Sequence, residues 1–355
     1  MNVEELFTSM VERRSSHIHL VPGSPVMMRM NNQLQAVDGQ ILSPADTRAI
    51  ADAIMNDQLR DEFETNFETD FSFSVPGLSR FRINVFRQRG SVAIVISTNP
   101  PAPPTIEELG LPEVLKTLAL EVDSGLVMIT GPKASGKSHT LAALVNYILE
   151  MRTVQVVTIE NPIDFLHKNK RGIICQREIG TDTQSYEAAF KSLTHQAADI
   201  LVVTGAESYE VIDKVLSMCA GGNLVLCTAQ APNAQVMLEK MIDYYPPHLQ
   251  QQARTMLSVG LQAVISQVLL NKAAGDGLVP AFEVLLGTTQ VKSLIKDGKF
   301  FQVQGVMSTS GREQGMVSQE MAMRALIKKN LVTADEALRK AIRPDELKKV
   351  MALPY

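Results

Sequence analysis

The sequence has 355 residues, which is long for a single hydrophobic core and predicts two or three domains. Hydrophobic residues make up 45% of the chain and charged residues 20%, as in ordinary soluble globular proteins. Lysine and arginine total 34 against 38 aspartates and glutamates, a net charge of −4. This balance creates no global field that would attract nucleic acid or anionic lipid, so we expect no nucleic-acid partner.

The N-terminal segment and the cysteines predict a cytoplasmic protein. Residues 1–16 contain acids and lack the apolar segment of a signal peptide, and the longest apolar runs are too short to span a bilayer. The three cysteines, Cys175, Cys219 and Cys227, do not have the spacing of a metal site. We expect all three to be buried thiols in a reducing compartment.

The first part of the chain combines helices with short strands. An amphipathic helix is predicted over 3–14, and a second helix from the Ser43 cap to about Met55, because Ser-Pro suits a helix start. Partial alternation of β-branched and aromatic residues predicts five strands, at 17–20, 26–30, 71–75, 81–86 and 92–96. These elements define an N-terminal domain over 1–98.

A proline-rich connector over 99–106 marks the domain boundary. Its prolines at 100, 101, 103 and 104 cannot pair in a sheet and favour a stiff, extended conformation. Strand and helix patterns alternate after it, with strands predicted at 125–130, 154–159, 200–203 and 224–226. This alternation predicts an α/β core with a mostly parallel sheet over 107–290. From 291 to 355 the strands stop, and short helices such as 319–328 and 334–342 predict a helical C-terminal region.

A phosphate-binding loop is predicted between the first core strand and the next helix. The sequence matches G-x-x-x-x-G-K-[ST] through Gly131, Pro132, Lys133, Ala134, Ser135, Gly136, Lys137 and Ser138, with His139 following in the helix. In such a loop the backbone N–H groups and the helix N-terminus face phosphate oxygens. Lys137 would reach the β- and γ-phosphates and Ser138 would bind Mg²⁺. The alternative is a glycine-rich turn with a surface lysine, and Ala134 would be costly if its backbone were left-handed.

Four further motifs resemble those of the type IV pilus retraction ATPases, the PilT/PilU type, with most similarity to PilU. These motifs are Ile54–Asp57, the segment 81–91 (FRINVFRQRGS), Thr158–Asp164 and Gln176–Gly180. The resemblance covers about residues 3–350. It implies a PAS-like N-terminal domain, a RecA-like core and a ring of six subunits, with ATP and Mg²⁺ bound between the domains.

The same resemblance implies a role, a place and partners. It implies twitching motility, a location peripheral to the inner membrane at the pilus base, and two kinds of partner, a retraction ATPase paralogue and the inner-membrane platform protein. It also implies that Arg89 lies on the phosphate side and that Glu160 polarises the attacking water. For Arg89 the alternative is a solvated strand end, and for Glu160 it is a carboxylate that only braces the adjacent loop.

Several motif positions depart from the family pattern. In the second motif Asn161 replaces an aspartate and Asp164 replaces a glutamate. Counted from Asp199, Gly205 stands at the position of the family's Walker B glutamate, and Glu207 and Ser208 stand at the positions of its arginine and aspartate. Asn223 and Gln230 stand at the positions of two family histidines. His195 and Ala198 replace a family arginine and proline, and Ser97 replaces another family arginine. Glu207 would replace the lost carboxylate only if the end of the strand bulged by two residues.

Three functions are consistent with this pattern. The chain could be an active motor subunit that retracts pili, a pseudo-ATPase that binds ATP and regulates an active paralogue, or an interaction scaffold with a vestigial phosphate loop. The lost charges argue against the first, because γ-phosphoryl transfer depends on positioned charge. The intact loop argues against the third. We therefore predict an ATP-binding accessory subunit in which hydrolysis is weak or absent.

Overall fold

The structure is a computed structural model that describes residues 3–13, 15–30, 33–75, 77–98, 102–193, 195–275, 277–309 and 311–352. The chain divides into two compact units, Met1–Ala102 and Pro103–Tyr355. Each unit has its own sheet and its own hydrophobic core. Within the described ranges, no helix has the length and apolar character needed to cross a membrane. Part of the predicted connector, residues 99–101, lies outside the described residues.

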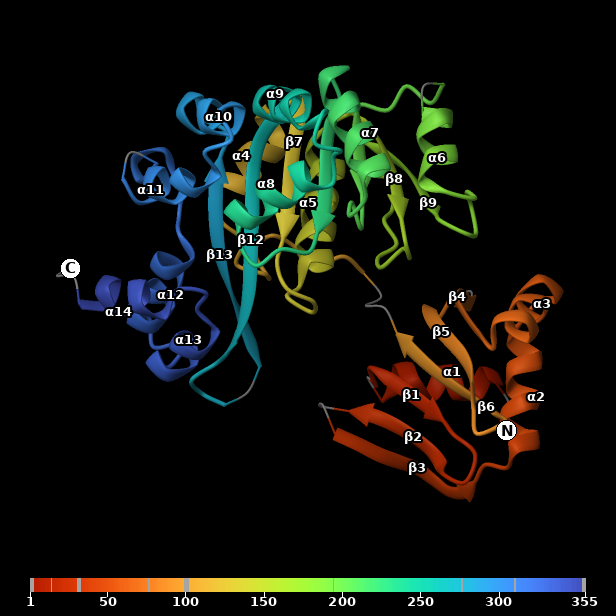
Figure 1. Cartoon of the computed structure of the whole chain (residues 1–355). Coiled ribbons are helices and arrows are strands. Elements are labelled where there is room, and N and C mark those ends of the chain that lie inside the picture. Colours follow the sequence, from red (N-terminus) through yellow and green to blue (C-terminus); the bar gives the residue numbers. More distant parts are fainter. Residues whose placement is uncertain are drawn as a thin grey trace. The chain divides into compact units, whose positions relative to one another are not determined.

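The N-terminal unit is a PAS-like α/β domain built on one antiparallel sheet with strand order β3-β2-β1-β6-β5-β4 (Figure 1). Its elements are α1 (Val3–Glu12), β1 (His17–Leu20), β2 (Pro25–Met30), β3 (Gln33–Ile41), α2 (Pro44–Ile54), α3 (Asp57–Asn66), β4 (Glu68–Val75), β5 (Ser79–Gln88) and β6 (Ser91–Thr98). Ser43 caps α2 as predicted, and its hydroxyl accepts a hydrogen bond from the Asp46 N–H in a capping box.

The C-terminal unit has a RecA-like core, and its seven-stranded sheet has the order β13-β12-β7-β11-β10-β8-β9. All its strand pairs are parallel except β12 with β13. Its core elements are α4 (Val114–Glu121), β7 (Gly125–Thr130), α5 (Lys137–Met151), β8 (Gln155–Glu160), β9 (Ile173–Glu178), α6 (Tyr186–Leu193), β10 (Ile200–Val203), α7 (Tyr209–Ala220), β11 (Leu224–Ala229), α8 (Ala234–Asp243), α9 (Gln250–Gly260), β12 (Leu261–Asn271) and β13 (Leu278–Leu286). The predicted α/β architecture is confirmed.

Helices cover both faces of this sheet, and the side chains of β7 show how. Leu126 and Met128 pack in the cluster formed with α6 to α9, whereas Val127 and Ile129 pack on the opposite face against α4 and α5. Successive strand residues point to opposite faces, so a strand buried on both sides must be apolar throughout. All six residues of β7 are buried, which fixes the starting point of the loop that follows it.

A helical region follows β13. It comprises α10 (Thr289–Lys296), η1 (Phe300–Gln302), α11 (Val303–Ser308), η2 (Arg312–Gln314), α12 (Gln319–Lys328), α13 (Ala334–Lys340) and α14 (Pro344–Ala352). Figure 1 shows α12 to α14 gathered beside the outer part of the β12–β13 hairpin, where Met323, Ala337 and Leu347 pack with Leu270. The helical C-terminal region is confirmed by this arrangement.

The expectation of three buried cysteines is wrong for one of them. Cys219 and Cys227 are buried, but Cys175 is exposed. Cys175 lies on β9, which is the edge strand of the sheet, and there one face of the strand is not covered.

Candidate nucleotide-binding site

The predicted phosphate loop connects β7 to α5 at the carboxyl-terminal edge of the sheet. Helix α5 begins at Lys137 after Gly136, whose backbone is left-handed at φ 89°. The first N–H groups of a helix have no intrahelical partner and carry partial positive charge. The loop therefore presents backbone donors where phosphate oxygens would bind.

Two loop positions show how tightly the backbone is folded. A Cβ on Gly131 would lie 2.4 Å from the carbonyl oxygen of Gln267 and 2.4 Å from the Ser135 hydroxyl, so only glycine fits. Ala134 has φ 60°, the left-handed conformation in which an alanine is strained. A left-handed residue other than glycine destabilises the fold by about 1–2 kcal/mol. The strain that the sequence analysis considered for Ala134 is therefore present in this loop.

Lys137 folds back onto its own loop. Its Nζ donates hydrogen bonds to the carbonyl oxygens of Gly131, at 3.0 Å, and Pro132, at 2.9 Å. Burial lowers the pKa of Lys137, and the negative charge of Glu207 acts in the opposite direction. These carbonyls hold the ammonium group at the loop, where phosphate oxygens would replace them as acceptors.

Gln267 of β12 supports the loop from the neighbouring strand. Its side chain is 2% exposed, and its Nε2 donates to the Ser135 carbonyl oxygen at 2.7 Å. The Gln267 Oε1 and the Ser135 hydroxyl are buried without a hydrogen-bond partner among the described residues. The sequence analysis missed this residue, although the polar pair Ser266-Gln267 interrupts the apolar run between Ala263 and Leu270 and was a usable signal.

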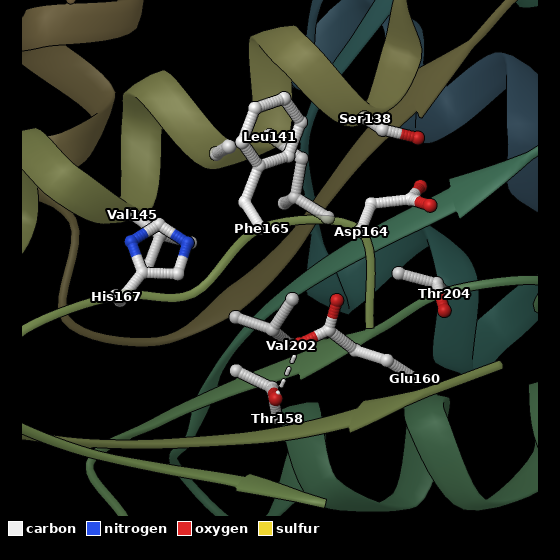
Figure 2. A pocket seen from close by; sticks show the side chains of 11 residues that line it. Ser138, Leu141, Val145, Thr158, Glu160, Asp164, Phe165, His167, Val202 and Thr204 are labelled. Carbon is white, nitrogen blue, oxygen red and sulfur yellow. Dashed lines mark hydrogen bonds between the residues drawn. The ribbon is translucent and has the colours of Figure 1, made fainter. Parts of the chain in front are cut away.

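Glu160 ends β8 and is almost completely buried, with 7% exposure. Its Oε1 accepts a hydrogen bond from the Thr158 hydroxyl at 2.6 Å (Figure 2). The same oxygen accepts a second hydrogen bond from Gln176 Nε2 at 3.1 Å. Burial raises the pKa of Glu160 to about 7, against the effect of these two hydrogen bonds. A carboxyl group with a pKa near neutrality can exchange a proton at physiological pH.

A small cavity of about 20 Å³ lies between α5, β8 and β10. It has room for about one water molecule. It is lined by Ser138, Leu141, Ala142, Val145, Thr158, Glu160, Asp164, Phe165, His167, Val202 and Thr204. Figure 2 shows the Asp164 carboxylate and the Ser138 hydroxyl on one side of this lining, and Glu160 near Thr158. The structure thus brings Ser138 and Glu160, two predicted site residues, to one cavity.

The end of β10 has no carboxylate at the motif position. Gly205 stands there with φ 67°, and its N–H donates to the Thr228 hydroxyl at 3.3 Å. The left-handed turn at Gly205 is followed by Glu207, whose exposed carboxylate accepts a hydrogen bond from the Gln230 N–H at 2.8 Å. Glu207 is not among the residues that line the cavity beside Ser138. Strand β10 ends at Val203 and the chain turns at Gly205. The replacement of the lost carboxylate by Glu207 therefore stays a prediction.

The residues at the two histidine positions take part in local backbone contacts. Asn223 donates through Nδ2 to the Ala198 carbonyl oxygen at 2.6 Å. Gln230 contributes its N–H to Glu207, and its carbonyl oxygen accepts from Lys240 Nζ at 2.8 Å. These contacts connect the strand ends to one another.

Two other predicted residues, His139 and Arg89, are not among the residues that line the cavity. His139 is exposed, and its ring packs edge-on against Phe165 with centroids 5.0 Å apart. Arg89 belongs to the N-terminal unit, where it forms the β5–β6 turn together with Gly90, at φ 50° and 76°. The phosphate-side role of Arg89 therefore stays a prediction.

The oxygen atoms near the loop fit a magnesium ion that arrives with a nucleotide. Among the described residues, no group of three or more histidine, cysteine, aspartate or glutamate side chains is arranged to hold a metal. Mg²⁺ prefers oxygen ligands and often takes one or two protein groups together with substrate phosphates. The Ser138 hydroxyl and the Asp164 carboxylate, which line the same cavity, are groups of this kind.

Comparisons with known proteins agree with this geometry. A family profile described as type II/IV secretion system protein matches residues 2–352. The type IV pilus retractation ATPase PilT of Pseudomonas aeruginosa is 36% identical over 97% of this chain and 99% of that protein. The type IV pilus ATPase PilU of the same organism is 35% identical over 99% of this chain and 92% of that protein.

Solved structures give the same result. A crystal structure of the pilus retraction motor PilT with bound ADP has a TM-score of 0.90 and 34% identity, covering 98% of this chain and 99% of that one. The ATPase DotB of Legionella pneumophila shares the fold, with a TM-score of 0.80 at 18% identity over 99% of this chain and 94% of that one. The chain therefore belongs to the type II/IV secretion system protein family, among its PilT/PilU-type members.

Proposed function

We propose that this chain is an ATP-binding subunit of the pilus-retraction type that hydrolyses ATP poorly and acts as an accessory ring subunit beside an active paralogue. One observation carries the proposal. The phosphate loop is complete from Gly131 to Ser138, whereas the adjoining end of β10 has glycine at the carboxylate position. The chain keeps the groups that bind phosphate and lacks groups that stabilise its transfer.

ATP is the nucleotide that the comparisons favour. PilT and PilU are named as ATPases, and the solved PilT structure contains ADP. Ser138 would hold Mg²⁺, which would neutralise phosphate charge when bound, and Lys137 would face the β- and γ-phosphates. Resemblance to the pilus ATPases motivates the ring of six subunits, its location at the pilus base and its platform-protein partner.

One observation favours the second candidate, an active motor. Glu160 has a pKa of about 7 and borders a cavity that fits one water molecule, as a group that activates water should. However, one oxygen of Glu160 already accepts two hydrogen bonds, and no second carboxylate extends from the end of β10. Glu160 alone would support a residual rate and not a motor cycle.

Nucleotide affinity and phosphate release, measured on the purified chain alone and mixed with an active retraction ATPase, test the proposal. We expect Mg-ATP binding, very slow release by the chain alone, and mixed assemblies in light scattering. A chain that stays monomeric with nucleotide and with the active relative would contradict the accessory-subunit role.

A further inference from the structure

The phosphate loop closes around one residue of the neighbouring strand, Gln267. In the parallel pairing of β12 with β7, Ser266 lies opposite Thr130, so Gln267 is level with the first residue of the loop. A Cβ on Gly131 would lie 2.4 Å from the Gln267 carbonyl oxygen, and a Cβ on Gly136 would lie 3.1 Å from Gln267 Nε2. The two glycines of the motif therefore leave room for the backbone and the side chain of this residue.

The contact made by Gln267 fixes the direction of one peptide group in the loop. Its Nε2 donates to the Ser135 carbonyl oxygen at 2.7 Å. The peptide bond between Ser135 and Gly136 is trans, and in a planar trans peptide the C=O and N–H groups point in opposite directions. Since the carbonyl points at Gln267, the Gly136 N–H points away from it. Backbone N–H groups that point out of such a loop are its donors to phosphate oxygens.

Gln267 is an unfavourable residue for this position in terms of stability alone. Its side chain is 2% exposed, and its Oε1 has no hydrogen-bond partner among the residues that the structure describes. A buried acceptor without a partner destabilises a fold, whereas an apolar side chain of the same length would not have this effect. Residues that break a local packing rule in this way are expected at functional sites.

Gln262, near the start of the same strand, provides an internal comparison. Its Nε2 also donates to a backbone carbonyl oxygen, that of Ser124, at 2.9 Å. This contact lies where β7 begins, at the opposite edge of the sheet from the phosphate loop, and Gln262 is partly exposed. Strand β12 thus makes the same type of contact at both ends of β7, and of the two only the contact of Gln267 reaches the loop.

We propose that Gln267 is a positioning residue for the nucleotide, which holds the Ser135–Gly136 peptide so that the Gly136 N–H is aligned with a phosphate oxygen before the nucleotide arrives. The inference rests on the proposed ATP-binding function. Gln267 would not touch the nucleotide and would act through the loop backbone. A donor that is already aligned needs no ordering when the ligand binds. The affinity for ATP should therefore depend on Gln267 more than the stability of the fold does.

Calorimetric titration with Mg-ATP, together with denaturant unfolding of the same variants, separates these two effects. We expect Gln267→Met, which keeps the side-chain length and removes the donor, to weaken ATP affinity about tenfold, an effect typical of one hydrogen bond to a charged group. Its free energy of unfolding should change little, because the variant also removes the unpaired Oε1. Gln267→Asn keeps the amide but is one methylene shorter, and it should lose the same affinity. Gln262→Met is the matched control and should bind ATP as the wild type does.

The amide signal of Gly136 is a readout that a merely structural role would not change. In nitrogen-15 NMR spectra of the ligand-free chain, this signal should broaden or shift in Gln267→Met and stay unchanged in Gln262→Met. ATP should move the amide proton downfield in the wild type and by less in Gln267→Met.

Two results would overturn the assignment. One is wild-type ATP affinity in Gln267→Met or, if that variant does not fold, in Gln267→Asn. The other is an unchanged Gly136 signal in the ligand-free variant. A wild-type chain that binds no ATP would instead refute the proposed function, and the ligand-free spectra would still test the contact between Gln267 and the loop.

Discussion

The two halves of the candidate site lie at one edge of the sheet but differ in how much of the expected motif pattern they contain. On the phosphate-loop side, β7, α5 and β12 keep Gly131, Lys137 and Ser138 in a packed frame supported by Gln267. On the other side, Gly205 and Gln230 follow the ends of β10 and β11, where the resemblance to the pilus ATPases implies charged or titratable groups. We therefore expect binding and hydrolysis to be separable within one fold, because they would depend on different strand ends.

Restoring the family residues at the end of β10 tests this contrast most strongly. The variant Gly205→Glu, Glu207→Arg, Ser208→Asp should increase phosphate release by about 100-fold, since one positioned charge is commonly worth about 10²–10⁴ in rate. Gly205 has φ 67°, so glutamate there requires the turn to rearrange, and this strain limits the gain. Addition of Lys137→Ala should abolish the increase. No change in a folded triple variant would show that these positions do not limit hydrolysis.

The second largest effect is expected on ATP affinity, when the loop lysine Lys137 is removed. Lys137→Ala should weaken ATP affinity about tenfold or more, because it deletes a charge-assisted contact worth roughly 1.5–3 kcal/mol. Calorimetry on the full chain measures this change. Lys214→Ala, at an exposed lysine on α7, is the control and should bind ATP as the wild type does. Equal affinity in Lys137→Ala and wild type would contradict the phosphate-loop assignment.

Glu160 predicts a pH dependence of stability. Its folded pKa of about 7 exceeds the ordinary value of 4.5, so the native state binds more protons between these values. Stability from this group is fully present below about pH 4.5 and is lost as the pH rises through 7. In the wild type, ionisation of Glu160 should lower the free energy of unfolding by about 2 kcal/mol between pH 5 and pH 8. Glu160→Gln should not show this decrease. Denaturant titrations of both chains at the two pH values measure this difference, and parallel pH profiles would contradict it.

We expect the smallest effect, a change in the free energy of unfolding, at the strained loop residue Ala134. Ala134→Gly should stabilise the chain by about 0.5–1 kcal/mol, because relief of the left-handed strain outweighs the added flexibility of the unfolded state. Ala188→Gly, at an exposed alanine in α6, is the matched control and should destabilise the chain by about 1 kcal/mol. The free energy of unfolding is the readout for both variants. The same sign in both would contradict the proposed strain.

The elements that the sequence revealed are those with strong local patterns. The strand at Gly125–Thr130 and the helix at Gln319–Lys328 have the predicted bounds, because an apolar run and a capped amphipathic pattern specify them locally. Helix α3 was missed since Phe63 is its one buried residue, and β3 was missed because its sequence alternates weakly at a sheet edge. The β12–β13 hairpin was not predicted as a pair, because its position beside β7 depends on tertiary packing.

For the site, the loop motif was readable because its residues are contiguous. Ser138 and Glu160 are 22 positions apart, and their shared cavity follows from the sheet order. Gln267 could not be assigned to the loop without that order, since β12 becomes the neighbour of β7 only in the folded sheet. Asp164 lines the same cavity as Ser138, and its position likewise depends on the side chains of β9 that hold the segment after β8.

Steady-state phosphate release by the purified chain, at saturating Mg-ATP and with nucleotide occupancy measured in the same sample, shows whether this chain binds ATP without hydrolysing it. We expect an occupied site and turnover at the limit of detection, with no difference from Lys137→Ala beyond background. Robust turnover that Lys137→Ala abolishes, at the rate of about 1 s⁻¹ or more common in enzymes, would contradict it.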